Sequence, residues 1–179
     1  MVRLGSAVVV VIALFLPSAF GQSEPTEAQY AIYSAFLRAQ LSGKHGIDDL
    51  RVGEKGSVIS PMIEPFRQKL SEKRLADIKV QLPEVEVETL DSLASCTTNS
   101  YRLRKKLDLP VEYNLMLPEH VKGRYGYINF SCVGTNRSGS QAVFYVSRLK
   151  CDCAVEKLVL MRKVQDGWMV VKEIVQWIA

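Results

Sequence analysis

Acid–base and nucleophilic chemistry could come from only a few side chains in this sequence. It contains two histidines: His45, which follows Lys44 in a segment rich in glycine and charge, and His120, which follows Glu119. Neither belongs to an H-x-x-x-H or H-E-x-x-H array, so the spacing predicts ordinary exposed side chains rather than metal ligands. Cys96 and His120 could act as a nucleophile and its base, but nothing in the local sequence marks that thiol as activated. We therefore assign no catalytic residue, and we expect no metal ion and no cofactor.

Three carboxylates alternate along one short segment. Glu84, Glu86 and Glu88 are separated by Val85 and Val87. In an extended strand, this spacing would place all three carboxylates on one face, where they could bind a cation or perform acid–base chemistry. A charged sheet edge that discourages strand pairing is the interpretation we prefer. The sequence also lacks a P-loop, a G-x-S-x-G elbow and a dinucleotide fingerprint.

The four cysteines are candidates for disulfide bonds. They are Cys96, Cys132, Cys151 and Cys153, and the last two form a C-x-C rather than the C-x-x-C of thioredoxin-like sites. Four cysteines allow three connectivities, and the spacing alone does not choose between them. We prefer a structural disulfide, while free thiols and a metal or redox role remain open alternatives.

The first 21 residues have the pattern of a secretory signal peptide. Arg3 precedes an apolar run over 7–16, Pro17 breaks the run, and 19–21 offers a cleavage site. The run is about half as long as the roughly 20 residues that a membrane anchor requires. We therefore expect a secreted or periplasmic protein over 22–179, which contacts a membrane only through the signal peptide before cleavage.

Positive charge is modest and locally clustered. Removal of Arg3 lowers the formal net charge from +4 to +3, because 22 Lys and Arg then face 19 Asp and Glu. Basic residues cluster in 69–74 and 102–106, each interleaved with apolar residues at helical spacing. This pattern predicts solvated helix faces, and we expect no nucleic-acid partner. The partner class that remains is an unknown protein or small-molecule ligand.

Helical periodicity dominates the first part of the chain. Thr26 and Gln29 form a capping box, and Tyr30, Tyr33, Phe36, Leu37 and Leu41 recur at steps of three and four before Gly43. The aromatic stripe of this helix is typical of a core-facing surface. A second helix is predicted from Ser60 and Pro61 to about Ile78, and a third from about Leu90 to Leu107. The small polar residues over 95–100 weaken that third helix, because their side chains compete for backbone hydrogen bonds.

After Pro110 the period changes to two, which predicts successive strands. Turns are expected at 136–139, at 151–153 and at Asp166 with Gly167. The predicted strands cover 111–117, 128–132, 141–147, 157–164 and 168–177. Apolar residues on both faces of the last strand predict that it is central or covered on both sides. Helices followed by an antiparallel meander define an α+β fold, with 22–179 as a single domain.

The C-terminal third resembles an uncharacterised family of secreted bacterial proteins. The resemblance rests on Ser131-x-Val133-Gly134-x-Asn136, on Gln141-Ala142-x-x-Tyr145-Val146, on a cysteine-bearing turn, and on Trp168 and Trp177. It implies that Cys151 and Cys153 are the family cysteines and that Cys96 and Cys132, if they pair, pair with each other. The order of helices and strands is also similar, by fold-level analogy, to cone-shaped folds of the nuclear-transport-factor-2 or ketosteroid-isomerase type. The resemblance implies no activity.

The function expected from these observations is binding rather than catalysis. We expect a non-catalytic ligand- or partner-binding module of the cell envelope or extracellular space. The alternative is a small hydrolase or isomerase with a cup between the first helix and the sheet, lined by Tyr30, Tyr33 and a carboxylate. A third hypothesis is thiol–disulfide exchange at Cys151 and Cys153.

Overall fold

The structure is a computed structural model that describes residues 24–42, 58–63, 70–97, 100–116, 127–150, 153–165 and 167–178. The predicted signal peptide, both histidines, Cys151 and the side chain of Cys153 lie outside the described residues. None of the described helices is both long enough and apolar enough to cross a membrane.

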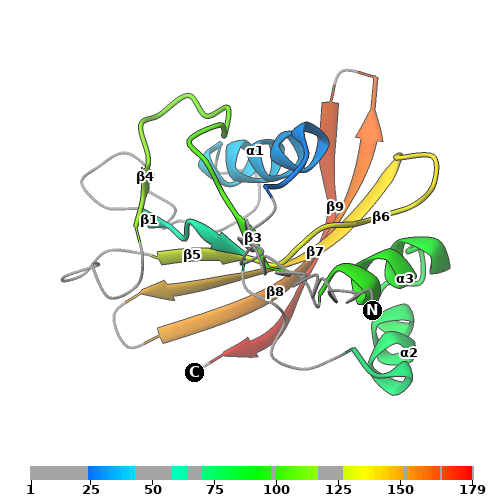
Figure 1. Cartoon of the computed structure of the whole chain (residues 1–179). Helices are drawn as coiled ribbons and strands as arrows, with labels where there is room; N and C mark the ends of the chain where they lie inside the picture. The colour runs from blue at the N-terminus through cyan, green and yellow to red at the C-terminus, as the bar shows by residue number, and fades with distance from the viewer. Residues whose placement is uncertain are drawn as a thin grey trace, which may run out of the picture.

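The described chain forms an α+β fold, as predicted (Figure 1). Its helices are α1 (Glu27–Leu41), α2 (Glu72–Gln81) and α3 (Val87–Cys96). Its strands are β1 (Val58–Ile59), β2 (Met62–Ile63), β3 (Tyr101–Arg102), β4 (Asn114–Leu115), β5 (Tyr127–Phe130), β6 (Gly134–Thr135), β7 (Gln141–Lys150), β8 (Cys153–Val164) and β9 (Gly167–Ile178).

One mixed sheet organises the fold. Its strands follow the order β4-β1-β5-β7-β8-β9, with β6 also paired to β7, while β2 and β3 form a separate two-stranded sheet. The expected antiparallel meander is present in β5, β7, β8 and β9. The parallel pairing of β1 with both β4 and β5 was not predicted, because two-residue strands are too short to show a period.

The helices cover opposite faces of this sheet. Side chains alternate along β7, so that Phe144 packs against α1 whereas Gln141 bonds to α3. Tyr33 and Phe36 of α1 close this side of the core, with the Tyr33 ring 4.6 Å from that of Phe130 and the Phe36 ring 5.5 Å from that of Phe144. The predicted aromatic stripe of α1 is therefore core.

The start of α1 confirms the predicted capping box. Gln29 N donates to Thr26 Oγ1 at 3.3 Å, and Thr26 N donates to Gln29 Oε1 at 2.9 Å. These two bonds satisfy backbone donors that a helix N-terminus otherwise leaves open. The helix ends at Leu41, and Ser42 N closes its last turn by donating to Arg38 O.

The predicted start of the second helix at Ser60 is wrong. Met62 and Ile63 form β2, and α2 begins at Glu72, after Ser71 caps it by accepting a hydrogen bond from Arg74 N. Pairing with β3 is the physical reason, because Leu103 N donates to Pro61 O and because Met62 and Ile63 are the register partners of Arg102 and Tyr101. The Ser60 hydroxyl also bonds to both the N–H and the carbonyl of Met62, which favours a local turn.

The predicted third helix is shorter than expected and begins earlier. It spans Val87–Cys96, and the chain over 101–102 is already strand β3. The hydroxyl groups of Ser95 and Thr97 donate to the carbonyls of Asp91 and Ala94. These bonds agree with the expectation that small polar side chains in this segment compete for backbone hydrogen bonds.

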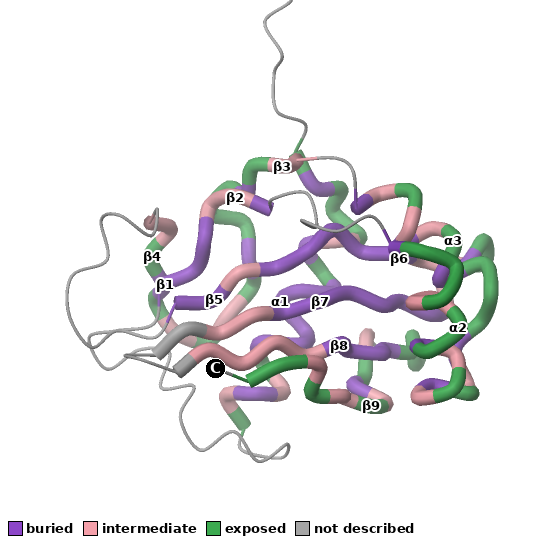
Figure 2. The backbone as a smooth tube through the Cα atoms, turned by 90° about the horizontal axis from the view of Figure 1, so that it is seen from below, coloured by how far each residue is buried: buried purple, intermediate pink, exposed green. Residues whose placement is uncertain are grey.

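The last strand was predicted to be central or covered on both sides, and it is not central. Strand β9 pairs only with β8 among the described strands and forms the edge of the sheet. Met169, Val175 and Trp177 are about half exposed, and Figure 2 colours β9 mostly as intermediate and exposed, in contrast to the buried β7. Apolar residues occur on both faces because α1 and α2 each contact part of the strand. Gln40 of α1 donates a hydrogen bond to Glu173, and Arg74 of α2 donates one to Gln176.

Candidate functional site

A groove of about 380 Å³ lies where β3 and β4 approach the segment over 58–63. Its lining mixes basic and apolar side chains and comprises Pro61, Arg102, Leu103, Arg104, Lys105, Leu115 and Met116. These residues come from three separate stretches of the chain.

The position of Pro61 explains why a groove forms there. Met116 N donates to Ile59 O at 3.2 Å, and Leu103 N donates to Pro61 O at 2.7 Å. β4 and β3 are therefore bonded to carbonyls two residues apart in 58–63, where the chain bends at Pro61. Pro61 has no N–H to donate to a partner at this junction. The two neighbouring chains separate beside it and leave the groove between them.

The groove carries three exposed cations. Arg102, Arg104 and Lys105 are exposed, whereas Leu103 between them is buried. Within the described residues, no carboxylate forms an ion pair with any of the three. Lys105 Nζ lies 5.9 Å from the centre of the Tyr113 ring, which favours a cation above its face.

Lys106, the next residue, differs from these three cations because it forms ion pairs. Lys106 Nζ lies 2.8 Å from Glu24 Oε1 and 3.4 Å from Glu27 Oε1. The hydrogen bond with Glu24 raises the pKa of the Lys106 ammonium and lowers the pKa of the Glu24 carboxyl. Within the part of the chain that the structure describes, ion pairs therefore neutralise Lys106 next to α1, whereas Arg102, Arg104 and Lys105 form no close ion pair, although the charge of Arg104 also helps to lower the pKa of Glu24.

The basic segment is fixed to α1 by buried hydroxyl groups. Arg104 N donates to Tyr30 OH at 2.7 Å, and Tyr30 OH donates to Glu24 Oε1 at 3.2 Å. Asp108 N donates to Ser34 Oγ at 2.9 Å. Burial is the main reason that the pKa of Tyr30 is raised. These contacts prevent the backbone of the groove wall from forming a regular helix.

The predicted solvated helix face over 102–106 is therefore wrong. Leu103 and Leu107 are both buried, and their separation of four residues is the spacing that predicted a helix. The chain between them is nevertheless irregular. It is held by the hydroxyl groups of Tyr30 and Ser34, each 74 residues away in the sequence, and by the nearer Tyr113 hydroxyl, which accepts a hydrogen bond from Leu107 N. No local sequence signal reveals these partners, and the groove was not predicted.

The structure joins Cys96 to Cys132 in a disulfide with the two Cα atoms 6.0 Å apart. This is the pairing that the family resemblance implied. It links the end of α3 to the chain between β5 and β6. It also removes Cys96 as a nucleophile, because the bonded sulfur has no thiolate form. The roles considered for Cys151, Cys153 and His120 concern side chains outside the described residues.

The three alternating glutamates do not form an extended edge, so that interpretation is wrong. Glu86 is the N-cap residue of α3, and Glu88 lies in its first turn. Their carboxylates accept hydrogen bonds from Asn136 Nδ2 at 2.8 Å and from Arg137 N at 3.2 Å. They dock the 136–140 turn onto the positive end of the α3 dipole, a structural role.

The polar residues of the C-terminal resemblance also build the fold. Gln141 Oε1 accepts from Glu86 N at 2.7 Å and from Thr89 Oγ1 at 3.0 Å, while its amide nitrogen donates to Glu84 O at 3.1 Å. Asn136 Oδ1 accepts from the backbone N–H groups of residues 140 and 141. Ser131 Oγ accepts from Tyr145 N. These side chains hold turns and helix ends in place.

The space between α1 and the sheet is filled and does not form the expected cup. Tyr33 is fully buried, and its hydroxyl donates to Ser131 O at 2.7 Å. Burial raises the pKa of Tyr33 well above its ordinary value. Tyr30 is also buried, and its hydroxyl is engaged by Glu24 and Arg104. Neither tyrosine lines a cavity as the enzyme hypothesis required.

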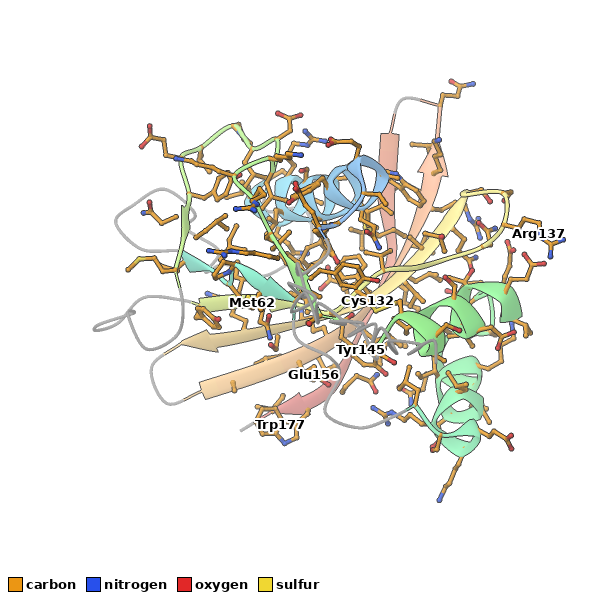
Figure 3. All side chains as sticks on the ribbon, viewed as in Figure 1. Met62, Cys132, Arg137, Tyr145, Glu156 and Trp177 are labelled. Carbon is orange, nitrogen blue, oxygen red and sulfur yellow. A yellow bond between two sulfur atoms is a disulfide. The ribbon has the colours of Figure 1, made fainter. Side chains whose placement is uncertain are left out.

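A second polar cluster lies on the opposite face of the sheet. Arg74 of α2 donates to Gln176 Oε1 at 2.6 Å, and it lies near Tyr145 and Glu156, which Figure 3 labels on neighbouring strands. Loss of hydration raises the pKa of both the Glu156 carboxyl and the Tyr145 hydroxyl, and Arg74 opposes both shifts. This cluster ties α2 to the sheet.

The described chain is thus an α+β fold with a basic groove at the junction of β3 and β4. No known protein family, no curated protein and no solved structure matches this chain. The resemblance to the secreted bacterial family stays a prediction. Within the described residues, no group of three or more His, Cys, Asp and Glu side chains could hold a metal ion.

Proposed function

We propose that this chain is an exported, non-catalytic binding module of the cell envelope or extracellular space, and that the groove beside Pro61 binds an anionic ligand or partner. The observation that carries the proposal is the set of three exposed cations, Arg102, Arg104 and Lys105, on one groove, none of which forms a close ion pair with a carboxylate of the described residues.

Electrostatics favours an anion at this position. Like charges held close together repel one another, and a bound anion replaces that repulsion with attraction. The overall charge is only +4, so the attraction comes mainly from this local cluster rather than from the whole molecule. Leu115 and Met116 add apolar surface to the groove, which suits a ligand that has both negatively charged and apolar groups.

Two features favour export. Disulfides persist in oxidising compartments and are rare in the cytosol, and the Cys96–Cys132 bond is of this kind. The first 21 residues carry the three-part pattern of a signal peptide. The measurement is the mass and location of the product after expression of the full chain. A processed, oxidised form outside the cytoplasm is expected, and an uncut, reduced cytosolic form would contradict export.

Binding can be tested with a fluorescein-labelled hexaglutamate peptide in a polarisation titration. The double variant Arg102→Gln/Lys105→Gln should bind it about tenfold more weakly than the native chain, because each exposed ion pair contributes up to about fivefold. The double variant Lys73→Gln/Lys163→Gln removes the same charge from exposed positions on α2 and at the end of β8, and it should bind normally.

Equal losses in the two double variants would show that net charge, and not the groove, attracts the peptide. A labelled hexalysine peptide that binds as tightly as hexaglutamate would contradict an anion site. Turnover of an ester, a glycoside or an enolisable substrate, abolished by the groove variant, would contradict a non-catalytic role.

A further inference from the structure

We propose that Trp177 and Glu156 form a second ligand site, on the face of the sheet opposite α1, and that this site binds a ring of an uncharged saccharide. Neither residue lines the basic groove, so the inference goes beyond the proposed function and does not rest on it.

Strand pairing places the two side chains next to each other. Glu156 of β8 and Trp177 of β9 are register partners in an antiparallel pair, so they lie on the same face with Cβ atoms about 5 Å apart. Tyr145 of β7 shares this face, because it pairs with Leu158, two residues along β8 from Glu156. Figure 3 shows Tyr145, Glu156 and Trp177 in a row across the three strands. Tyr145 is buried, Glu156 is half-buried and Trp177 is exposed, so the row runs from the core to solvent.

The indole of Trp177 supplies an apolar surface with one polar edge. The residue is 54% exposed, although tryptophan is on average highly buried. Over the described stretches of chain, its N–H donates no hydrogen bond. The ring face carries partial negative charge, which attracts the C–H groups on the flat side of a pyranose ring. A sugar can therefore stack on the ring and accept a hydrogen bond from its edge.

The Glu156 carboxylate supplies an acceptor that the described fold does not use. No N–H or O–H group of the described residues donates to it, and no cation lies within ion-pair distance. Loss of hydration already raises the pKa of this carboxyl. A carboxylate that has lost water is stabilised by a new hydrogen-bond donor, and a sugar hydroxyl is such a donor.

Arg74 of α2 limits the charge of the ligand. Its guanidinium donates to Gln176 Oε1 at 2.6 Å and lies close enough to Glu156 to oppose the rise of that pKa. A cation at the site would be repelled by Arg74, and an anion by Glu156. A wholly apolar ligand would remove more water from the carboxylate without replacing its hydrogen bonds. An uncharged ring with hydroxyl groups avoids these three costs.

The probes are three uncharged oligosaccharides, cellohexaose, chitohexaose and laminarihexaose. Isothermal titration calorimetry on the full chain should detect at least one of them with a dissociation constant in the millimolar range or below. Trp168→Phe leaves Trp177 as the single tryptophan of the chain. The fluorescence of that variant should shift when the oligosaccharide is added, because the sugar covers the indole.

Variants locate the site. Trp177→Ala should weaken binding about tenfold, the effect of about 60 Å² of buried apolar surface. Glu156→Leu should also weaken it about tenfold, the effect of one hydrogen bond to a charged group. Met169→Ala, at a half-exposed apolar position near the other end of β9, is the matched control and should bind normally, as should Arg102→Gln/Lys105→Gln. Circular dichroism checks each fold, and Trp177→Phe, which should bind with intermediate affinity, replaces an unfolded Trp177→Ala.

The outcomes separate this inference from the proposed function. Failure of all three oligosaccharides to bind, or binding that Trp177→Ala leaves unchanged, would overturn the saccharide site and leave the anion-binding groove. Choline that binds more tightly than every sugar would overturn it in favour of a cation site. Dimerisation of the native chain that Trp177→Ala abolishes in sedimentation velocity would show that a second copy covers the indole instead. Saccharide binding without anion binding would contradict the proposed function alone.

Discussion

Gly134 of β6 lies against Leu93 of α3 so closely that a β-carbon on the glycine would come within 2.4 Å of Leu93 N. The same β-carbon would lie 2.5 Å from Thr89 O. Both neighbours are backbone atoms, which cannot rotate away as a flexible side chain could. The absence of a side chain at this position is what allows α3 to pack directly on β6.

Gly134→Ala should lower the free energy of unfolding by about 1–3 kcal/mol, because the new methyl group must displace the α3 backbone. Gly139→Ala is a useful comparison. Gly139 has φ +63° but nothing within 4 Å of its added β-carbon, so the cost there is only the conformational penalty of about 1–2 kcal/mol. Urea unfolding of both variants measures the difference. An unchanged free energy of unfolding for Gly134→Ala would show that α3 does not pack as described.

Removal of the Cys96–Cys132 bond should also destabilise the fold. It closes a loop with a sequence separation of 36, for which the chain-entropy relation gives about 4 kcal/mol. The double variant Cys96→Ser/Cys132→Ser should therefore unfold at a lower urea concentration than the native chain. Reductant should lower the stability of the native chain much more than that of the double variant. Equal sensitivity of both proteins to reductant would contradict this bond.

Gln141→Leu should cost about 2–4 kcal/mol, because it leaves the buried Thr89 hydroxyl and the partly buried Glu84 carbonyl and Glu86 N–H without their hydrogen bonds. Thr89→Val removes one of those partners and should cost less. The double variant should be less destabilised than the sum of the two single variants, since they share one hydrogen bond. Strict additivity in the unfolding measurements would show that the two side chains are not coupled.

The pKa of Glu156 predicts a pH dependence of stability. Loss of hydration raises this pKa above 4.5 in the folded state, with Arg74 opposing the shift. The folded chain then holds the proton more tightly than the unfolded chain, so stability is lost as the pH rises through the interval above 4.5. Glu156→Gln should therefore be more stable relative to the native chain at pH 7 than at pH 4.

Thermal unfolding at the two pH values measures this change. Glu112→Gln, at an exposed position, is the matched control and should show a much smaller difference between pH 4 and pH 7. A Glu156→Gln variant that is relatively less stable at pH 7 would mean that attraction to Arg74 outweighs the loss of hydration.

Local signals were sufficient to predict some parts of the fold. The capping box of Thr26 and Gln29 and the apolar stripe of α1 predicted that helix within a residue or two. The turn over 136–139 and the alternation that follows it predicted the antiparallel pairing of β7 with the preceding chain. In these segments, the stabilising contacts lie a few residues apart, and the sequence pattern reports them directly.

Other parts depend on contacts that no local pattern contains. The groove exists because Pro61 interrupts an edge at which β3 and β4 meet, and those strands are 12 residues apart or more in sequence. Leu103 and Leu107 have the spacing of a helix, yet the hydroxyl groups of Tyr30, Ser34 and Tyr113 hold the chain in another form. The bonds to Tyr30 and Ser34 each span 74 residues, and long-range hydrogen bonds of this kind override local propensity.

The packing of α1 against β9 has a consequence for synthesis of the chain. Gln40 Nε2 donates to Glu173 Oε1 at 2.6 Å across 133 residues, and Tyr33 bonds to Ser131 across 98. A polypeptide made from its N-terminus thus produces the aromatic stripe of α1 long before the strands that cover it. During that interval the stripe is an exposed apolar surface, which favours aggregation until β5 and β7 cover it.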